Sequence, residues 1–188
     1  MIICDMTKQK LKSLLPYAGI PLIGIALFLR QKGNMDAQIF LWSELLIIFG
    51  YIAAVIDLKS KKIPNSLVLA MFVAWFVSMI PKIFLDINTV TILLKDAAAG
   101  FLLGGGLLLL VYVISRGGLG GGDVKFMAAA GLFLGFWGTF LAMLYGILLA
   151  ALIRIILLLV KKKSAKDTIP LAPFMYIGIL IALFIWCY

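Results

Sequence analysis

Two aspartates stand at the ends of long apolar runs in this sequence, where a carboxyl group can do chemistry beside a membrane. Asp57 follows the six uncharged residues 51–56, and Asp123 follows the glycine-rich stretch 117–122. Ionisable groups in membrane helices are costly to bury and are functional candidates by default. One such aspartate is often only an interface anchor. Two of them, one behind a glycine run, favour a shared site.

A facing pair of carboxyl groups suits the hydrolysis of an amide bond. Like charges at close range cannot both ionise easily, so one group keeps a proton. The ionised partner can take a proton from water, while the protonated one polarises the scissile carbonyl and later donates to the leaving amine. Because the two groups titrate as a pair, the sequence assigns no separate role to either.

The glycines before Asp123 have a physical use. Glycine accepts a positive φ and lets backbones approach closely. Residues 120–122 can therefore bring Asp123 against a neighbouring helix and leave room for an extended peptide. From glycine alone, a flexible turn is the simpler interpretation. A phosphate-binding loop is disfavoured, because that motif needs a Lys followed by Ser or Thr and Asp123 would repel phosphate.

The elements that position these aspartates must lie in lipid. Of the 188 residues, 64% are hydrophobic and 13% are charged, with a mean hydropathy of +1.17. Soluble domains are about half apolar and a quarter charged. We therefore expect an all-α, polytopic membrane helix bundle of about seven transmembrane helices. The apolar runs are 14–29, 38–56, 66–85, 97–115, 126–142, 143–160 and 170–187.

The fifth and sixth runs are continuous in sequence. As one straight helix, 35 residues would reach roughly 50 Å, well beyond the roughly 30 Å hydrocarbon core. We therefore expect the chain to fold back between Gly138 and Gly146. The spacings Gly100-x-x-x-Gly104 and Gly131-x-x-x-Gly135 predict close packing between helices.

Basic residues set the predicted orientation. With the loop after Asp57 in the cytoplasm, seven spans place twelve basic residues inside and four outside, as the positive-inside rule demands. The twelve are Lys8, Lys10, Lys12, Lys59, Lys61, Lys62, Arg116, Lys125, Lys161, Lys162, Lys163 and Lys166, and the four are Arg30, Lys32, Lys82 and Lys95. We expect a multi-pass plasma-membrane protein with its N-terminus and both aspartates on the cytoplasmic side.

The remaining composition excludes several classes of protein. The net charge is +9, but membrane topology explains it better than nucleic acid does. There is no histidine, and Cys4 and Cys187 form no CxxC pair. No metal site is expected, and we predict no cofactor.

Three segments together resemble a known family. Asp57 is followed by a basic stretch and Ile63-Pro64-Asn65, residues 120–125 read Gly-Gly-Gly-Asp-Val-Lys, and residues 169–174 read Ile-Pro-Leu-Ala-Pro-Phe. In this order they resemble the first catalytic segment, the GxGD-x-K motif and the late proline motif of the type IV prepilin peptidases. These enzymes are a branch of the GxGD intramembrane aspartic proteases. The resemblance covers about residues 40–180.

The resemblance implies an aspartic endopeptidase that removes basic leaders from type IV prepilins or related pseudopilins at the cytoplasmic face. Cleavage would fall after a glycine just before a hydrophobic helix. Asp57 and Asp123 would be catalytic. The supporting loop and candidate substrate contacts would be Gly120, Gly122, Lys125, Pro64, Asn65, Pro170 and Pro173. The implied partners are prepilin-like precursors and membrane lipids.

The chain departs from larger family members, which carry a cytoplasmic N-methyltransferase insertion, often with CxxC motifs. No such segment lies between the first two runs. We expect peptidase activity alone. We also expect one domain over residues 1–188, with a cytoplasmic segment and uncleaved signal anchor at 1–35 and a peptidase core at 38–187.

Two other classes of protein compete with the protease. A transporter or channel could use Asp57 and Asp123 as proton or cation sites, but it should show an inverted repeat and a broken helix near mid-membrane. The sequence shows neither feature. An inert membrane scaffold would make the aspartates dispensable. Among proteases, a preflagellin peptidase or a signal-peptide-peptidase type is an alternative, but Ile63-Pro64-Asn65 favours the prepilin branch.

Overall fold

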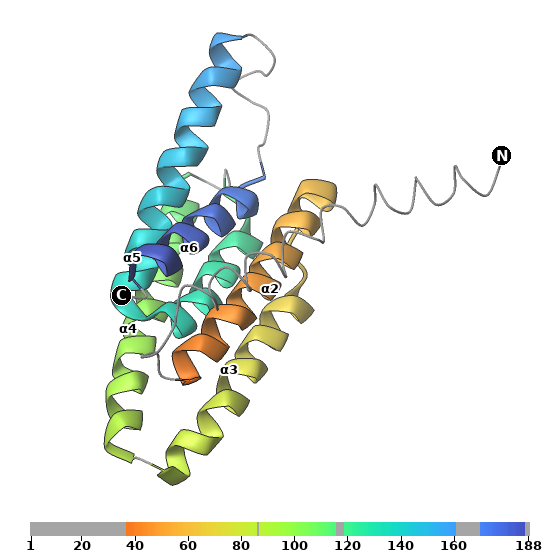
Figure 1. Ribbon diagram of the computed structural model, residues 1–188. Coiled ribbons are helices and arrows are strands. Elements are labelled where there is room, and N and C mark those ends of the chain that lie inside the picture. Colours follow the sequence, from red (N-terminus) through yellow and green to blue (C-terminus); the bar gives the residue numbers. More distant parts are fainter. Residues whose placement is uncertain (1–36, 86, 116–118, 161–169, 187–188) are drawn as a thin grey trace, which may run out of the picture. The chain divides into compact units, whose positions relative to one another are not determined.

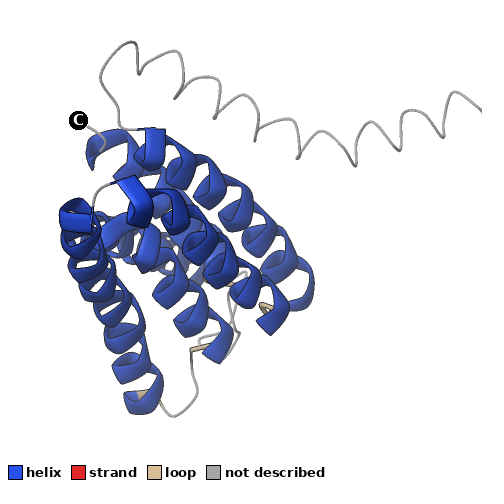
Figure 2. Cartoon of the chain, turned by 90° about the horizontal axis from the view of Figure 1, so that it is seen from below, coloured by secondary structure: helices blue, strands red, loops and turns tan. Residues whose placement is uncertain are grey.

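The computed structural model describes residues 37–85, 87–115, 119–160 and 170–186. Every regular element within them is an α-helix (Figures 1 and 2), which confirms the predicted all-α class. The helices are α2 (Ala37–Ser60), α3 (Asn65–Leu85), α4 (Ile87–Ile114), α5 (Gly121–Leu159) and α6 (Ala172–Trp186).

Four of these helices are long and apolar enough to cross a membrane, and α6 is a shorter apolar helix. The chain is thus a multi-pass membrane protein. The predicted first span at 14–29, the signal anchor and the basic segment 161–166 lie outside the described residues, so the count of seven spans stays a prediction.

Helix α4 begins ten residues earlier than the predicted run at 97. The prediction was wrong there because Lys95 and Asp96 interrupt the apolar pattern. In the structure both side chains lie on an exposed part of the helix, so the helix continues through them. The other boundaries agree with the predicted runs within a few residues.

Helix α5 is broken at Gly135, where φ is 65° and ψ is −170°. A methyl group built on Gly104 would lie 2.5 Å from the Met127 carbonyl oxygen and 3.2 Å from Thr139 Cγ2. Along an unbroken helix these two residues would be roughly 18 Å apart, so the chain turns back between them and its two halves lie side by side (Figure 1).

The position of this break corrects one expectation. Folding back was expected between Gly138 and Gly146, whereas the break is at Gly135. The break falls where Asp96, on α4, accepts a hydrogen bond from the Phe136 amide at 3.0 Å. That acceptor satisfies an amide which a helix start leaves without an intrahelical partner. A contact between helices, invisible in the hydropathy pattern, thus fixes the turn.

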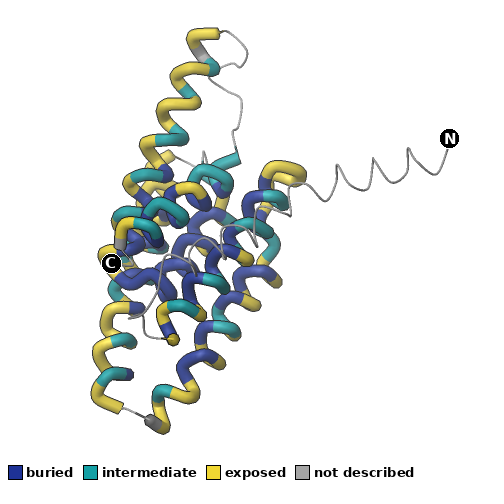
Figure 3. Tube along the Cα trace, viewed as in Figure 1, coloured by how far each residue is buried: buried dark blue, intermediate teal, exposed yellow. Residues whose placement is uncertain are grey.

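Close glycine contacts join α4 to α5, as the two small-residue spacings predicted. A methyl group on Gly100 would meet the carbonyl oxygens of Gly131 and Gly135, and one on Gly131 would meet Gly100. Backbones can approach this closely only where both helices present glycine. The first half of α5 is the centre of the packing, because residues 126–135 are all buried (Figure 3).

Helices α2 and α3 form a hairpin that is linked by hydrogen bonds far from its loop. Gln38 Nε2 donates to the Ser78 carbonyl oxygen at 2.9 Å, and Trp42 Nε1 donates to Ser78 Oγ at 2.8 Å. At the loop, Lys61 has a φ of 52° and its amide donates to the Asp57 carbonyl oxygen at 2.8 Å. This left-handed residue ends α2 and starts the short connection to α3.

Candidate active site

Asp57 and Asp123 occupy the ends of two different helices. Asp57 lies in the last turn of α2, and Asp123 lies in the first turn of α5. Both are buried in this apolar bundle, with exposed fractions of only 4% and 8%. A buried carboxyl group needs a partner or a proton to offset its lost hydration, so the surroundings of each group decide its chemistry.

Asp57 is held by the start of α6. Its Oδ2 accepts a hydrogen bond from the Ala172 amide at 3.0 Å. Ala172 is the first residue of α6, where backbone amides have no intrahelical acceptor. The contact joins the end of α2 to the beginning of α6 across 115 residues of sequence.

The two prolines of the late motif flank this contact. Pro170 precedes the helix, and Pro173 is its second residue, where proline's missing N–H costs no hydrogen bond. The amides of Phe174 and Met175 donate to the Leu171 carbonyl oxygen at 3.0 and 3.1 Å, which closes the first turn. The motif therefore presents the Ala172 amide to Asp57.

Two glycines before Asp123 have distinct packing roles. A methyl group on Gly120 would lie 2.7 Å from Asp123 Oδ2, and one on Gly122 would lie 3.1 Å from Ile63 Cβ and 3.2 Å from the Ile63 amide nitrogen. A methyl group on Gly121 would meet nothing within 4 Å. The structure thus leaves no room for a side chain at the first and third glycines, whereas a side chain at the middle glycine would meet no neighbouring atom.

These packing contacts bring the predicted pair together. Ile63 belongs to the loop that follows Asp57, and it packs on Gly122, immediately before Asp123. The two carboxyl groups interact electrostatically. Two interacting, buried carboxyl groups can share one proton, which lets one act as a base and the other as an acid.

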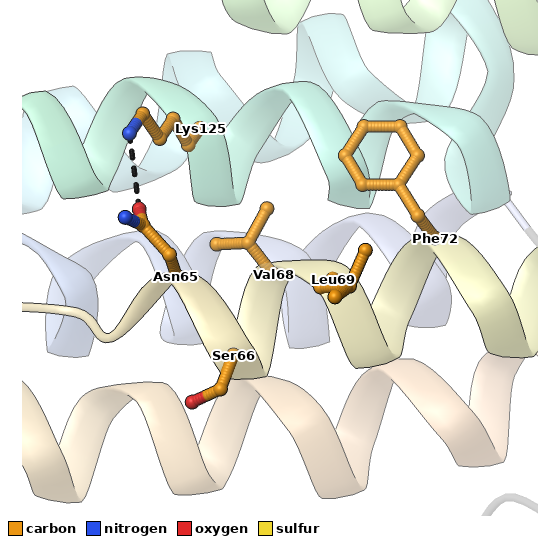
Figure 4. Close-up of a pocket in the computed structure, with 6 residues that line it drawn as sticks. All are labelled: Asn65, Ser66, Val68, Leu69, Phe72 and Lys125. Atoms are coloured by element: carbon orange, nitrogen blue, oxygen red, sulfur yellow. Dashed lines mark hydrogen bonds between the residues drawn. The ribbon is translucent and has the colours of Figure 1, made fainter.

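Lys125 and Asn65 lie beside this pair and bond to each other. Lys125 Nζ donates to Asn65 Oδ1 at 3.0 Å, which ties the first turn of α5 to the start of α3 (Figure 4). Pro64 directly precedes α3, and its carbonyl oxygen accepts from the Leu67 amide at 3.1 Å. These residues therefore set the angle between the two helices next to Asp123.

An open groove of about 390 Å³ runs along α3 from this bond. It is lined by Asn65, Ser66, Val68, Leu69, Phe72 and Lys125, and Figure 4 shows Val68 and Phe72 on the side of α3 that faces α5. The groove thus has one cationic group at the helix ends and an apolar wall beyond it.

Sequence reasoning missed three contributors to the site and its scaffold. Ala172 acts through its backbone and Ile63 through its packing, so the motifs that contain these two residues gave no sign of their roles. Asp96 was given no predicted role, although a carboxylate within a membrane helix is a signal. Within the described residues, no three Cys, Asp or Glu side chains gather as a metal site would require.

Comparison with known proteins assigns this chain to a family. The model of the type IV leader peptidase family matches residues 44–155, more than half of the chain, and that range includes both aspartates. The chain belongs to the type IV leader peptidase family. The resemblance seen in its three motifs is thereby confirmed.

Three curated relatives of this family member are each named prepilin leader peptidase/N-methyltransferase. The protein of Legionella pneumophila is 28% identical over 170 residues, 89% of this chain and 58% of its own length. That of Bacillus subtilis (strain 168) is 30% identical over 131 residues, 70% of this chain and 50% of its own. That of Pseudomonas putida is 27% identical over 190 residues, 93% of this chain and 60% of its own.

This chain therefore spans only half to three-fifths of the length of these relatives. No solved structure matches it.

Proposed function

We propose that this chain is an aspartic endopeptidase that removes the basic leader from type IV prepilin or pseudopilin-like precursors, with Asp57 and Asp123 as its catalytic pair. One observation carries the proposal: two interacting, buried carboxyl groups on separate helices in a member of the type IV leader peptidase family. General acid–base catalysis by such a pair requires no cofactor.

Charge supports an active site at the cytoplasmic face. Lys59, Lys61 and Lys62 follow Asp57, and Lys125 follows Asp123. Basic residues gather at the cytoplasmic ends of membrane helices. A basic leader would meet a basic protein surface there, so we propose that anionic lipid headgroups attract both partners.

The groove beside Asp123 supports a role for Lys125 and Asn65 in substrate contact. Its apolar wall suits the start of a hydrophobic helix, and Lys125, one of its lining residues, is two residues after Asp123. We propose that the residues after the cleaved bond lie in this groove.

The proposed activity is leader cleavage alone, performed by a peptidase core over residues 38–187. The names of the relatives combine two activities, but this chain has no methyltransferase insertion between its first two apolar runs. It contains no CxxC pair. The mature product made by this chain alone should therefore carry an unmethylated N-terminal amine, which mass spectrometry measures directly.

A transporter is the competing function, because it too uses broken helices and α5 is broken. The break, however, is twelve residues after Asp123, about 18 Å along a helix. Asp96 already caps its free amide. The broken helix therefore offers the aspartate pair no ion site, and the peptidase is the better account.

The test is cleavage of a model prepilin by the purified full chain in liposomes. The wild-type chain should release the leader after its final glycine, whereas Asp57→Asn and Asp123→Asn should each insert normally and release none. Glu44→Gln is the control, because Glu44 lies 13 residues before Asp57 in the same helix, about 20 Å away. Near-normal cleavage by either Asn variant would contradict the peptidase mechanism and favour a transporter or an inert scaffold.

A further inference from the structure

The two carboxyl groups of the candidate pair have different hydrogen-bond partners. Asp57 Oδ2 accepts from the Ala172 amide at 3.0 Å. Asp123 Oδ1 is fully buried, and no hydrogen-bond partner for it exists in the described part of the chain. The other oxygen, Oδ2, lies against Gly120, whose backbone amide interacts with it. The two groups are therefore not equivalent, although both are more than nine-tenths buried.

The partner of Asp57 favours a charged acceptor. The amides at a helix N-terminus carry a partial positive charge, and they bind anions. Pro173, the next residue, has no N–H, so the donors directed at Asp57 are the Ala172 amide and, just before the helix, the Leu171 amide. Lys61, one turn after Asp57, adds a positive charge that acts on the same carboxyl group.

The surroundings of Asp123 favour a neutral acid. An unpartnered, buried carboxyl oxygen is much less costly on a neutral acid than on a carboxylate. The nearby Lys125 donates to Asn65 Oδ1, and no hydrogen bond joins it to the unpartnered oxygen of Asp123. The charges of Asp57 and Asp123 act on each other equally, so the hydrogen-bond partners and not this repulsion distinguish the two groups.

We propose that Asp57 is the ionised base of the pair and that Asp123 holds its proton. The assignment rests on the proposed peptidase function where it concerns cleavage, but the protonation states themselves do not depend on it. It also explains the late proline motif, because that motif positions the Ala172 amide that keeps Asp57 charged.

The assignment fixes the path of each proton. Asp57 takes one proton from water as the water oxygen attacks the scissile carbonyl carbon, and Asp123 gives its proton to the carbonyl oxygen. The tetrahedral diol then collapses. Asp57 passes its new proton to the nitrogen as the carbon–nitrogen bond breaks, and a diol hydroxyl returns a proton to Asp123. The products are a carboxylic acid and an amine, and both aspartates regain their starting states.

Infrared difference spectroscopy of the purified full chain near neutral pH tests the protonation states without any substrate. Replacing Asp123 by Asn should remove a band of a protonated carboxyl group from the wild-type spectrum. Replacing Asp57 by Asn should remove bands of a carboxylate. Glu44 and other acidic groups are common to all three proteins and cancel in the differences. The opposite pattern, or two protonated bands, would overturn the assignment.

The hydrogen bond itself is tested by Ala172→Pro, with Ala172→Gly as the matched control. Proline removes the N–H at the first position of a helix, where proline is well tolerated, and glycine keeps it. In Ala172→Pro, kcat/KM on the acidic limb of the pH profile should fall about tenfold, the size expected for losing a charged hydrogen bond. The alkaline limb should keep its position, and in Ala172→Gly both limbs should keep their wild-type positions whatever the overall level of activity.

The possible outcomes distinguish a failure of the proposed peptidase function from a failure of the assigned protonation states. A shift of the alkaline limb alone to higher pH would show that Asp57 is the acid and Asp123 the base, and an unchanged profile would show that the Ala172 amide does not set the roles. If Ala172→Pro fails to insert, the infrared spectra still decide the assignment. A chain that cleaves no prepilin but shows the expected bands would refute the peptidase and leave the protonation states standing.

Discussion

Gly122 packs directly against Ile63, so that an added methyl group would lie 3.1 to 3.3 Å from three atoms of that residue. Through this contact the α2–α3 loop, which follows Asp57, rests on the helix start that carries Asp123. The distance between the two carboxyl groups therefore depends on glycine at position 122, because a larger side chain would push Ile63 away.

This contact predicts unequal effects of alanine within the glycine run. Gly122→Ala should lower leader cleavage roughly 10- to 100-fold, because small displacements of catalytic groups cost that much. Gly121→Ala should cleave like the wild type, since a methyl group there meets nothing within 4 Å. Cleavage assays on the two variants, with expression matched, measure the difference. Equal activity in both would contradict the packing role of Gly122.

Much of this arrangement could be predicted from the sequence. Hydropathy alone predicted the helical class and most helix boundaries, because a membrane-spanning helix must be continuously apolar. The three motifs predicted Asp57 and Asp123 as a pair. The partner of Asp57 could not be predicted, because Ala172 contributes a backbone amide that any residue except proline would supply. The break at Gly135 was also misplaced, since it depends on Asp96 from another helix.

Asp96 should stabilise the turn of α5 through its bond to the Phe136 amide, at 3.0 Å. Asp96→Leu removes the acceptor and should cost about 0.5–2 kcal/mol of stability, the range for a lost helix cap. Asp96→Asn keeps an acceptor oxygen and should cost much less. Thermal melting of both variants in detergent compares them. Identical melting temperatures would show that the hydrogen bond contributes nothing measurable to stability.

The predicted topology is seven spans with the loop after Asp57 and the start of α5 in the cytoplasm. Reporter fusions after Lys62 and after Lys163 should both report the cytoplasmic side, because basic residues are retained there. A fusion at Gly135 should report the opposite side, since the chain turns back at that residue. An external signal after Lys62 would show that the orientation is opposite to the predicted one. An external signal after Lys163 would show that the chain crosses the membrane a different number of times between these two positions.

The strongest test of the pair is its lack of additivity. Asp57→Asn and Asp123→Asn each keep the size of the side chain and remove the titrating group, so each should lower cleavage by at least the roughly 10²–10⁴-fold that general acid–base catalysis contributes. The double variant should lose little more than either single one, because groups that act as a unit are lost together. Cleavage of a model prepilin in liposomes, followed over long incubations, measures all three rates. If the double variant lost the product of the two single effects, Asp57 and Asp123 would be acting independently and would not share one reaction.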